Sequence, residues 1–283
     1  GVESMNIIGV GGAGCKIVKQ FTKYPQYTVH YIDHVNHGKG SLTLKKYDHP
    51  EKYEENAPDF TTFIEHIEGD DVIIVTCGAS IVSSVMLRLL EKMQEKNVTV
   101  HYIKPDLTML SKIKTLNERL VRNVLQHFAR SGMFDRVFLW DNQEVENIIG
   151  DVPVIGFWDT MNDVISSTIH SLNVFDHTEP VMGQMGPPGK TCRISSVGIK
   201  DMESNEEKMF FPLDNVRESC YIYNINEGRL KESTGLLKQI KEDLKAKLSE
   251  SLNISFGIFP SSYDRDFGYV LKHTSFVQNQ RQE

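Results

Sequence analysis

A glycine-rich turn follows the first apolar segment of the chain. Residues 5–16 read MNIIGVGGAGCK, which contains a G-x-G-x-x-G motif with one extra glycine, and a helix-like segment follows at residues 15–22. A strand that enters such a turn and leaves it as a helix brings free backbone N–H groups and the positive end of a helix dipole to one point, where a phosphate can bind. The candidate residues for this phosphate site are Gly9, Gly11, Gly12, Ala13 and Gly14.

Asp33 leaves open which nucleotide the turn would bind. It ends the strand-like segment YTVHYID. Dinucleotide-binding Rossmann units carry an acid for the ribose at about this place, ~20 residues beyond the glycines. This interpretation makes the protein an NAD-dependent enzyme. In another interpretation the glycines serve only close packing, and Asp33 is an ordinary residue at the end of a strand.

Asp33, His34 and His37 carry side chains that could bind a metal ion. The H-x-x-H lies in a predicted loop, and no third soft ligand stands near it in the sequence. We therefore interpret these residues as polar loop side chains and predict no metal site. The cysteines lack metal-type spacing and have apolar neighbours, which is typical of free thiols in a reducing cytoplasm. They are Cys15, Cys77, Cys192 and Cys220.

Composition and charge exclude several classes of protein. Of the 283 residues, 40% are hydrophobic and 24% are charged, the profile of a globular protein with a sizeable core. A formal net charge of −7 and a pI near 5.8 disfavour broad electrostatic attraction to nucleic acid. No apolar run reaches the ~18 residues that a membrane span needs. We therefore expect a cytoplasmic protein with neither a nucleic-acid partner nor a membrane span.

Strand-like and helix-like segments alternate through the first 175 residues. Near-continuous Val/Ile runs such as VIIVT indicate strands that are buried on both faces, and hence a parallel sheet covered by helices. The predicted strands are 5–10, 27–33, 71–76, 98–103 and 136–140. The predicted helices are 15–22, 80–96, 107–131 and 159–172.

The second half predicts a smaller mixed α/β domain. Strand-like segments lie at 191–199, 219–225, 253–259 and 267–276. A long amphipathic helix at 230–252 carries the apolar stripe Leu236, Leu237, Ile240, Leu244 and Leu248. The predicted fold is thus α/β, with a Rossmann-like, nucleotide-binding parallel-sheet domain at 5–158, a central connecting helix at 159–175 and the mixed α/β domain at 176–279.

The segment WDTMNDVISSTIHSL, residues 158–172, resembles the central helix of the tubulin/FtsZ superfamily. In that family an aromatic residue at this place stacks on guanine, and an Asn/Asp-Asp pair binds the edge of the base. The resemblance implies these roles for Trp158, Asn162 and Asp163. The chemistry fits, because an indole covers a purine face and a carboxylate accepts from the adjacent N–H donors of guanine. On its own, an ordinary amphipathic helix with a solvated Asn-Asp pair would also carry these residues.

Further segments match the same family in order. The glycine turn resembles its first nucleotide loop, and GDDVIIVTCG, VTVHYIKPDL and FDRVFLWDNQEV resemble three later strands with the turns that follow them. The resemblance extends from Met5 to Phe276. It implies binding of GTP or GDP, together with Mg²⁺, and head-to-tail assembly into a homopolymer. It also implies nucleotide contacts from Gly78, Ser80 and Asn142.

Departures from the family pattern concern the grip on a triphosphate and its hydrolysis. The family's signature loop reads GGGTGTG, whereas residues 77–83 read CGASIVS, and β-branched Ile81 and Val82 resist the positive φ angles that glycine allows. The turn after Lys104 and Pro105 lacks the Glu that the family commonly carries there.

The loop after the central helix also departs from the family pattern. In the family it reads close to N-x-D-F-x-D and positions the hydrolytic water for the nucleotide of the next subunit. Here the candidate catalytic residues Asp176 and Glu179 are displaced by one residue, which moves a carboxylate by ~3.3 Å in extended chain.

These observations predict a divergent tubulin/FtsZ-like cytoskeletal protein that binds a guanine nucleotide and assembles head to tail, with impaired hydrolysis. One alternative is a scaffolding homologue that has lost nucleotide binding, and the other is the NAD-dependent enzyme. The sequence stops at Gln282 and Glu283, soon after the last predicted strand. We therefore expect no C-terminal anchor peptide.

Overall fold

The computed structural model describes residues 4–249, 251 and 253–279, and it divides the chain into two units. Unit 1 contains the described residues up to Ser171 together with residues 277–279, and unit 2 contains those from Leu172 to Phe276. The boundary falls within α7 (Phe157–Asp176), the helix that we expected to connect the domains. Gln282 and Glu283, where we expected the chain to end without an anchor peptide, lie outside the described residues.

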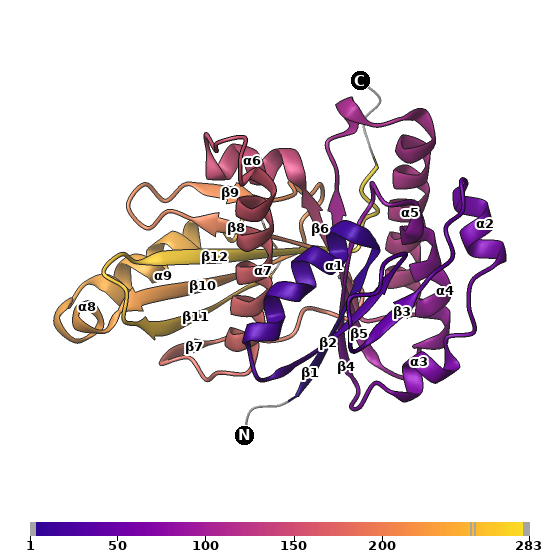
Figure 1. Ribbon diagram of the computed structural model, residues 1–283. Coiled ribbons are helices and arrows are strands. Elements are labelled where there is room, and N and C mark those ends of the chain that lie inside the picture. The colour runs from indigo at the N-terminus through magenta and orange to yellow at the C-terminus, as the bar shows by residue number, and fades with distance from the viewer. Residues whose placement is uncertain (1–3, 250, 252, 280–283) are drawn as a thin grey trace. The chain divides into compact units, whose positions relative to one another are not determined.

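Unit 1 is built on a sheet with the strand order β3-β2-β1-β4-β5-β6, and its neighbouring strands run parallel (Figure 1). This confirms the predicted parallel sheet, and each predicted strand is correct to within one residue at either end. The three-residue strand β3 was not predicted. The strands are β1 (Met5–Val10), β2 (Tyr27–Asp33), β3 (Ser41–Thr43), β4 (Asp71–Cys77), β5 (Asn97–Lys104) and β6 (Arg136–Asp141).

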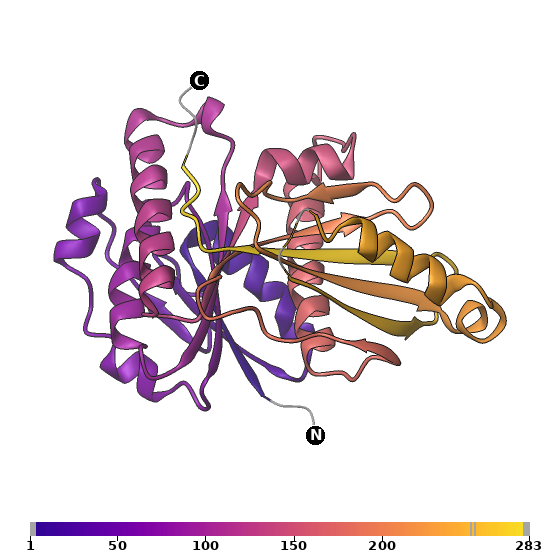
Figure 2. The same cartoon turned by 180° about the vertical axis from the view of Figure 1, so that it is seen from behind.

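Helices cover both faces of this sheet. The chain leaves β1 toward β2 but leaves β4 toward β5, in the opposite direction along the sheet. Right-handed crossovers therefore place α1 on one face and α4 and α5 on the other, as Figures 1 and 2 show. The helices are α1 (Gly11–Lys19), η1 (Gln20–Lys23), α2 (Pro50–Glu55), α3 (Thr61–Glu65), η2 (Ile81–Ser84), α4 (Val85–Lys92), η3 (Leu107–Met109), α5 (Lys112–Ser131), α6 (Asn142–Ile149) and the first part of α7.

All four helices predicted in unit 1 begin at another residue. The first starts at Gly11 rather than at residue 15, so the glycine turn is itself the first turn of α1. The helix predicted from residue 107 starts at Lys112, because the Ser111 side chain accepts a hydrogen bond from the Lys114 N–H and caps α5 there. The helix predicted at 80–96 is divided into η2 and α4 and ends at Lys92, and the helix predicted at 159–172 is α7, which already begins at Phe157.

Unit 2 contains a mixed sheet in the order β8-β12-β10-β11-β7, with β9 paired to β8. Its central strand β10 runs parallel to β11 and antiparallel to β12. Tyr221, Tyr223 and Ile225 alternate with Cys220 and Ile222 on β10, so the two groups face opposite sides of the sheet. The elements are β7 (Met182–Gln184), β8 (Ile194–Lys200), β9 (Glu207–Met209), β10 (Glu218–Asn226), α8 (Glu227–Glu232), α9 (Leu236–Ala246), β11 (Asn253–Ser261) and β12 (Phe267–Thr274).

The single helix predicted at 230–252 is wrong. The structure has two helices here, α8 and α9, and Gly235 stands at the N-cap of the second. A glycine inside a helix costs ~1 kcal/mol relative to alanine, which favours a break at this residue. Ile240 and Leu244 are buried as predicted, whereas Leu248 lies beyond the end of α9 and is 56% exposed. Residue 252 lies outside the described residues.

Two further observations concern the state of the cysteines and the length and polarity of the helices. All four cysteines are free and buried. Within the described ranges, every helix is too short or too polar to cross a membrane.

His101 is a buried titratable group in the core of unit 1. It lies on β5, where its Nδ1 accepts a hydrogen bond of 3.0 Å from Trp140 Nε1 and its ring stacks on Phe138. Burial lowers the pKa of His101 from 6.5 to about 3. The imidazole is therefore neutral in the folded protein and binds a proton near pH 6.5 only after unfolding.

We expect His101 to make folding sensitive to acid. Because its pKa is lower in the folded state, the unfolded state binds more protons, and stability falls as the pH drops below 6.5. Between pH 7 and pH 5 this loss amounts to about 2 kcal/mol. Urea unfolding of His101→Gln, which keeps an acceptor for Trp140, should show a pH dependence weaker by that amount. His127→Gln, at an exposed site on α5, should behave as the wild type, and a His101→Gln profile parallel to the wild type would contradict the assignment.

Candidate functional site

The carboxyl ends of β1 and β4 form a topological switch point in unit 1. The two strands are neighbours, with Val10 paired to Thr76, and the chain leaves them in opposite directions along the sheet. In open α/β sheets, ligands bind in the crevice outside the strand ends at such a point. The glycine turn follows β1 here, and residues 77–83, which we call the β4 loop, begin with the last residue of β4.

The glycines of the turn have different roles. A Cβ on Gly9 would lie 2.7 Å from the Cys15 Cα, and one on Gly14 would lie 2.4 Å from the Val75 carbonyl oxygen. Gly9 and Gly14 therefore allow α1 to pack closely against β1 and β4. This is the packing role that we had left open as an alternative.

Gly12 and Ala13 form the accessible part of the turn. Both are exposed in the first turn of α1, and a Cβ on Gly12 would meet nothing within 4 Å. The first N–H groups of a helix have no partner within the helix, and its N-terminus carries a partial positive charge. This end of α1 can therefore bind an anion.

Gly11 joins the turn to the β4 loop. Its φ of +81° is a left-handed conformation that side chains disfavour, and a Cβ there would lie 2.5 Å from the Ser80 Oγ. Ser80 is in turn held through its carbonyl oxygen, which accepts a hydrogen bond of 3.4 Å from Asn117 Nδ2. The two predicted phosphate-side segments are thus in direct contact.

Trp158, Asn162 and Asp163 lie in the first two turns of α7. The Trp158 side chain is 60% exposed, Asn162 is half-buried and Asp163 is exposed. Residues four apart share a helix face, so the indole and the Asn162 amide point to the same side. These side chains are free to meet a ligand.

His170 fixes the direction of α7 within unit 1. Its ring stacks on Tyr24, with centroids 3.7 Å apart, and its Nδ1 lies 2.8 Å from the Tyr27 hydroxyl at the start of β2. From the contact between His170 and Tyr27, α7 extends about 18 Å back to Trp158 and β2 extends about 20 Å on to Asp33. The two elements thus cover similar lengths from this contact. Because α7 runs beside α1 and starts after α6 at the carboxyl end of β6 (Figure 1), Trp158 lies at the level of the carboxyl ends of the strands.

Comparison with solved structures identifies the fold. FtsZ from M. jannaschii, solved as an empty dimer, matches with a TM-score of 0.71 and 13% identity over 96% of this chain and 88% of that chain. CetZ from Methanosaeta thermophila matches with a TM-score of 0.70 and 13% identity over 97% and 87% of the two chains. TubZ from Bacillus thuringiensis serovar israelensis, in a GTPγS-form protofilament, matches with a TM-score of 0.70 and 14% identity over 96% and 86%.

The chain has the tubulin/FtsZ superfamily fold. The family resemblance stated from the sequence is therefore confirmed at the level of the fold. No protein-family model matches the chain, and no curated protein matches it.

Within this tubulin/FtsZ fold, the altered β4 loop is a firmly held segment. The Ser83 hydroxyl donates to the Cys77 carbonyl oxygen at 2.7 Å and also lies 3.1 Å from the Thr76 hydroxyl. A Cβ on Gly78 would lie 2.1 Å from the Tyr102 hydroxyl, so this position requires glycine for packing. Burial raises the pKa of Cys77 to about 11, which keeps its thiol protonated.

Asn142 and its neighbour Asp141 are engaged in local structure. The Asp141 carboxylate accepts from the Gln143 N–H at 2.9 Å, which caps α6, and lies 3.7 Å from Lys104 Nζ. Asn142 is buried in the first turn of α6, with 8% of its surface exposed. A nucleotide contact from Asn142 would require this side chain to become accessible.

Asp176 and Glu179 lie at the other end of α7 from Trp158. Asp176 is the last residue of α7, Glu179 follows it, and both side chains are exposed.

Asp33 is poorly available for a ribose. Only 7% of its surface is exposed, one carboxylate oxygen accepts from the His34 N–H at 2.8 Å, and the other lies 2.8 Å from His37 Nε2. These contacts disfavour the NAD interpretation, because they use the oxygens that would bind the ribose hydroxyls.

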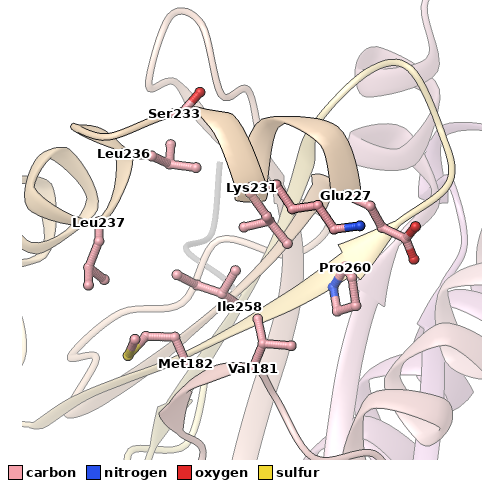
Figure 3. A pocket seen from close by; sticks show the side chains of 10 residues that line it. Val181, Met182, Glu227, Lys231, Ser233, Leu236, Leu237, Ile258 and Pro260 are labelled. Atoms are coloured by element: carbon pink, nitrogen blue, oxygen red, sulfur yellow. The ribbon is translucent and has the colours of Figure 1, made fainter.

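Unit 2 contains a cavity that the sequence did not indicate. It has a volume of about 540 Å³ and is lined mainly by apolar side chains such as Met182, Leu236 and Ile258 (Figure 3). Glu227 and Lys231 of α8 add the charged groups of its lining. The N-terminus of α9 reaches this cavity with the apolar side chains Leu236 and Leu237, whereas Gly12 at the N-terminus of α1 is exposed and has no side chain, so the switch point of unit 1 is the candidate nucleotide site.

Proposed function

We propose that the chain binds a guanine nucleotide at the switch point of unit 1 and assembles head to tail, with slow or absent hydrolysis. The observation that carries this proposal is the exposed, glycine-built N-terminus of α1 between the ends of β1 and β4. An N-terminus of this kind provides backbone donors and a partial positive charge for a phosphate group.

The base would be bound by the first two turns of α7. An exposed indole at Trp158 can cover a purine face, and the Asp163 carboxylate can accept from the paired N–H donors of guanine. The level of Trp158 beside the carboxyl ends of the strands supports a single site for phosphate and base.

A magnesium ion would be held mainly by the nucleotide. Mg²⁺ prefers oxygen ligands, keeps several waters and is commonly bound through substrate phosphates. The Ser80 hydroxyl beside Gly11 is the protein oxygen that fits this role best. Magnesium would supply charge neutralisation of the phosphates there.

Self-assembly is supported by the oligomeric forms of similar structures. The FtsZ structure is a dimer and the TubZ structure is a protofilament in its GTPγS form. In a head-to-tail polymer, the exposed Asp176 and Glu179 would face the nucleotide of the next subunit. Their displacement by one residue, together with the altered β4 loop, is the reason that we propose impaired hydrolysis.

We expect Asp163→Ala to remove the preference for guanine. A hydrogen bond to a charged group contributes about 1.5–3 kcal/mol, so GTP affinity should fall about 10- to 150-fold while the weaker binding of ATP stays unchanged. Titration calorimetry with GTP, ATP and NAD measures this. Asp159→Ala, at another exposed acid of the same helix, is the matched control and should bind GTP as the wild type does. Absence of GTP binding to the wild-type chain, or tight binding of NAD, would overturn the proposal.

A scaffolding role without nucleotide is the second candidate. The Ser80 side chain lies directly against Gly11, where a more open loop would leave room for a phosphate. Sedimentation of the purified chain with and without GTP separates the two candidates. Assembly that depends on GTP supports the nucleotide-binding polymer, and identical assembly after removal of all nucleotide supports the scaffold.

A further inference from the structure

We propose that Cys15, Asp33 and His37 form a zinc-binding site in unit 1. This site is distinct from the proposed nucleotide site and does not depend on it. The sequence around His37 offers no soft third ligand, and the fold supplies one from α1.

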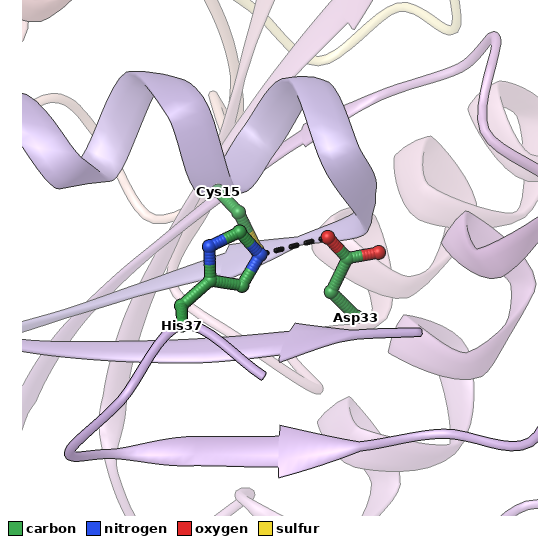
Figure 4. Close-up of side chains that lie close together, drawn as sticks. All are labelled: Cys15, Asp33 and His37. Carbon is green, nitrogen blue, oxygen red and sulfur yellow. Dashed lines mark hydrogen bonds and ion pairs between the residues drawn. The ribbon is translucent and has the colours of Figure 1, made fainter. Parts of the chain in front are cut away.

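The three side chains converge from different elements. Cys15 lies on α1, Asp33 ends β2 and His37 lies in the loop that follows (Figure 4). The Cys15 sulfur, a carboxylate oxygen of Asp33 and a ring nitrogen of His37 all lie within 4.8 Å of one another. His37 Nε2 lies 2.8 Å from Asp33 Oδ2, and Figure 4 shows the sulfur behind this nitrogen.

The distances suit a tetrahedral ion after a small adjustment. Zinc binds sulfur at ~2.3 Å and nitrogen or oxygen at ~2.0–2.2 Å, which places tetrahedral ligand atoms roughly 3.3–3.6 Å apart. The Cys15 sulfur must therefore approach by about 1 Å at most, and the contact between His37 and Asp33 must open slightly. The ion would replace the hydrogen bond that now joins those two side chains.

Other contacts hold Asp33 and His37 in place. The free oxygen of Asp33 accepts from the His34 N–H, whereas the Cys15 thiol donates to the Gly9 carbonyl oxygen at 3.4 Å and would give up this contact on binding the ion as a thiolate. The His37 ring stacks on Tyr31, with centroids 4.9 Å apart. The backbone N–H of His37 also donates to the Ser41 hydroxyl at 2.9 Å. Contacts of this kind orient the ligands of a metal site and reduce the cost of arranging them.

The donor set selects the metal. Thiolate, imidazole and carboxylate together suit zinc, whereas Mg²⁺ and Ca²⁺ prefer oxygen ligands alone. Three protein ligands leave a fourth position for water. Because thiolate and carboxylate carry two negative charges, Zn²⁺ makes the cluster neutral, which suits its burial: Cys15 is fully buried and Asp33 is 7% exposed.

Cobalt provides a direct test, because Co²⁺ occupies zinc sites and a thiolate bound to it absorbs in the near ultraviolet. The full chain, first freed of metal with a chelator, is titrated with Co²⁺ and then with Zn²⁺. We expect one equivalent of Co²⁺ to produce the sulfur-to-cobalt band and Zn²⁺ to abolish it. Cys15→Ser should lose the band. His37→Gln should bind at least about 10- to 100-fold more weakly, since even loss of a second-shell partner has an effect of that size.

Matched variants show whether the response belongs to this cluster. Cys220→Ser removes another buried thiol and His34→Gln removes the neighbouring histidine, and both should bind as the wild type does. If Cys15→Ser fails to fold, as judged by circular dichroism, His37→Gln and a rise in the melting temperature of the wild type with Zn²⁺ decide the matter. A wild-type chain without a sulfur-to-cobalt band, or a His37→Gln variant with unchanged affinity, overturns the proposal.

Discussion

Replacement of Glu118 by alanine is expected to lower the free energy of unfolding by about 3–5 kcal/mol, because it leaves a buried arginine without its counter-charge. Glu118 lies on α5 with 0% of its surface exposed, and Arg122, one turn later, is 4% exposed. Arg122 Nε lies 2.9 Å from Glu118 Oε1. Burial raises the pKa of Glu118, while the charge of Arg122 opposes that rise.

Urea unfolding of three variants tests this expectation. Glu118→Ala should show the full loss, whereas the double variant Glu118→Met/Arg122→Met should be nearly as stable as the wild type, since apolar side chains can replace a buried pair. Arg88→Ala breaks exposed pairs with Glu54 and Glu91 and should change stability by at most about 1 kcal/mol. A loss below 1 kcal/mol for Glu118→Ala would mean that Arg122 finds another partner or water.

The Glu118 pair also supports the β4 loop. The Tyr102 hydroxyl donates to both the Glu118 carboxylate, at 3.2 Å, and the Glu118 carbonyl oxygen, at 3.1 Å. A Cβ on Gly78 would lie 2.1 Å from the same hydroxyl. The position of the β4 loop at the switch point therefore depends on a buried polar network of α5 and β5. Gly78 packs against this network at the Tyr102 hydroxyl, and Ser80 is bound to α5 through Asn117.

The parallel sheet of unit 1 was predictable because its signal is local. The run VIIV of residues 72–75 in β4 is apolar at every position, and a strand buried on both faces has that pattern. Short elements carry no such signal. The three-residue strands β3, β7 and β9 are too short to show an alternation of apolar and polar residues, and each forms only three residue pairs with its neighbour in the sheet. The break at Gly235 was missed because helical segments, α8 and α9, lie close on both sides of it.

The candidate site was predictable only in part. The sequence indicates a glycine turn, but it cannot tell that Gly14 faces the carbonyl oxygen of Val75 while Gly12 faces open space, because these contacts come from β4. In the same way, the sequence places His37 beside Asp33 but not beside Cys15, which approaches from another element. Local spacing identifies residue types, and tertiary packing decides which of them meet.

Gly11→Ala is expected to lower the free energy of unfolding by about 2–5 kcal/mol. An alanine at φ of +81° costs about 1–2 kcal/mol, and its Cβ would also overlap the Ser80 side chain, which adds the ~1–3 kcal/mol typical of overpacking. Gly12→Ala is the matched control. Its Cβ would point into open space in the first turn of α1, so stability should stay the same or rise by up to about 1 kcal/mol.

The contact between the two loops can be separated from the backbone strain by a double-mutant cycle. Ser80→Gly removes the side chain that an alanine at Gly11 would meet. The double variant should therefore lose less free energy of unfolding than the two single variants together, by about 0.5–3 kcal/mol. The loss that Gly11→Ala still causes in the Ser80→Gly background measures the cost of the positive φ. Strict additivity would mean that Ser80 moves aside freely. In that case the β4 loop would leave room for a phosphate, and the argument for a scaffold without nucleotide would lose its structural basis.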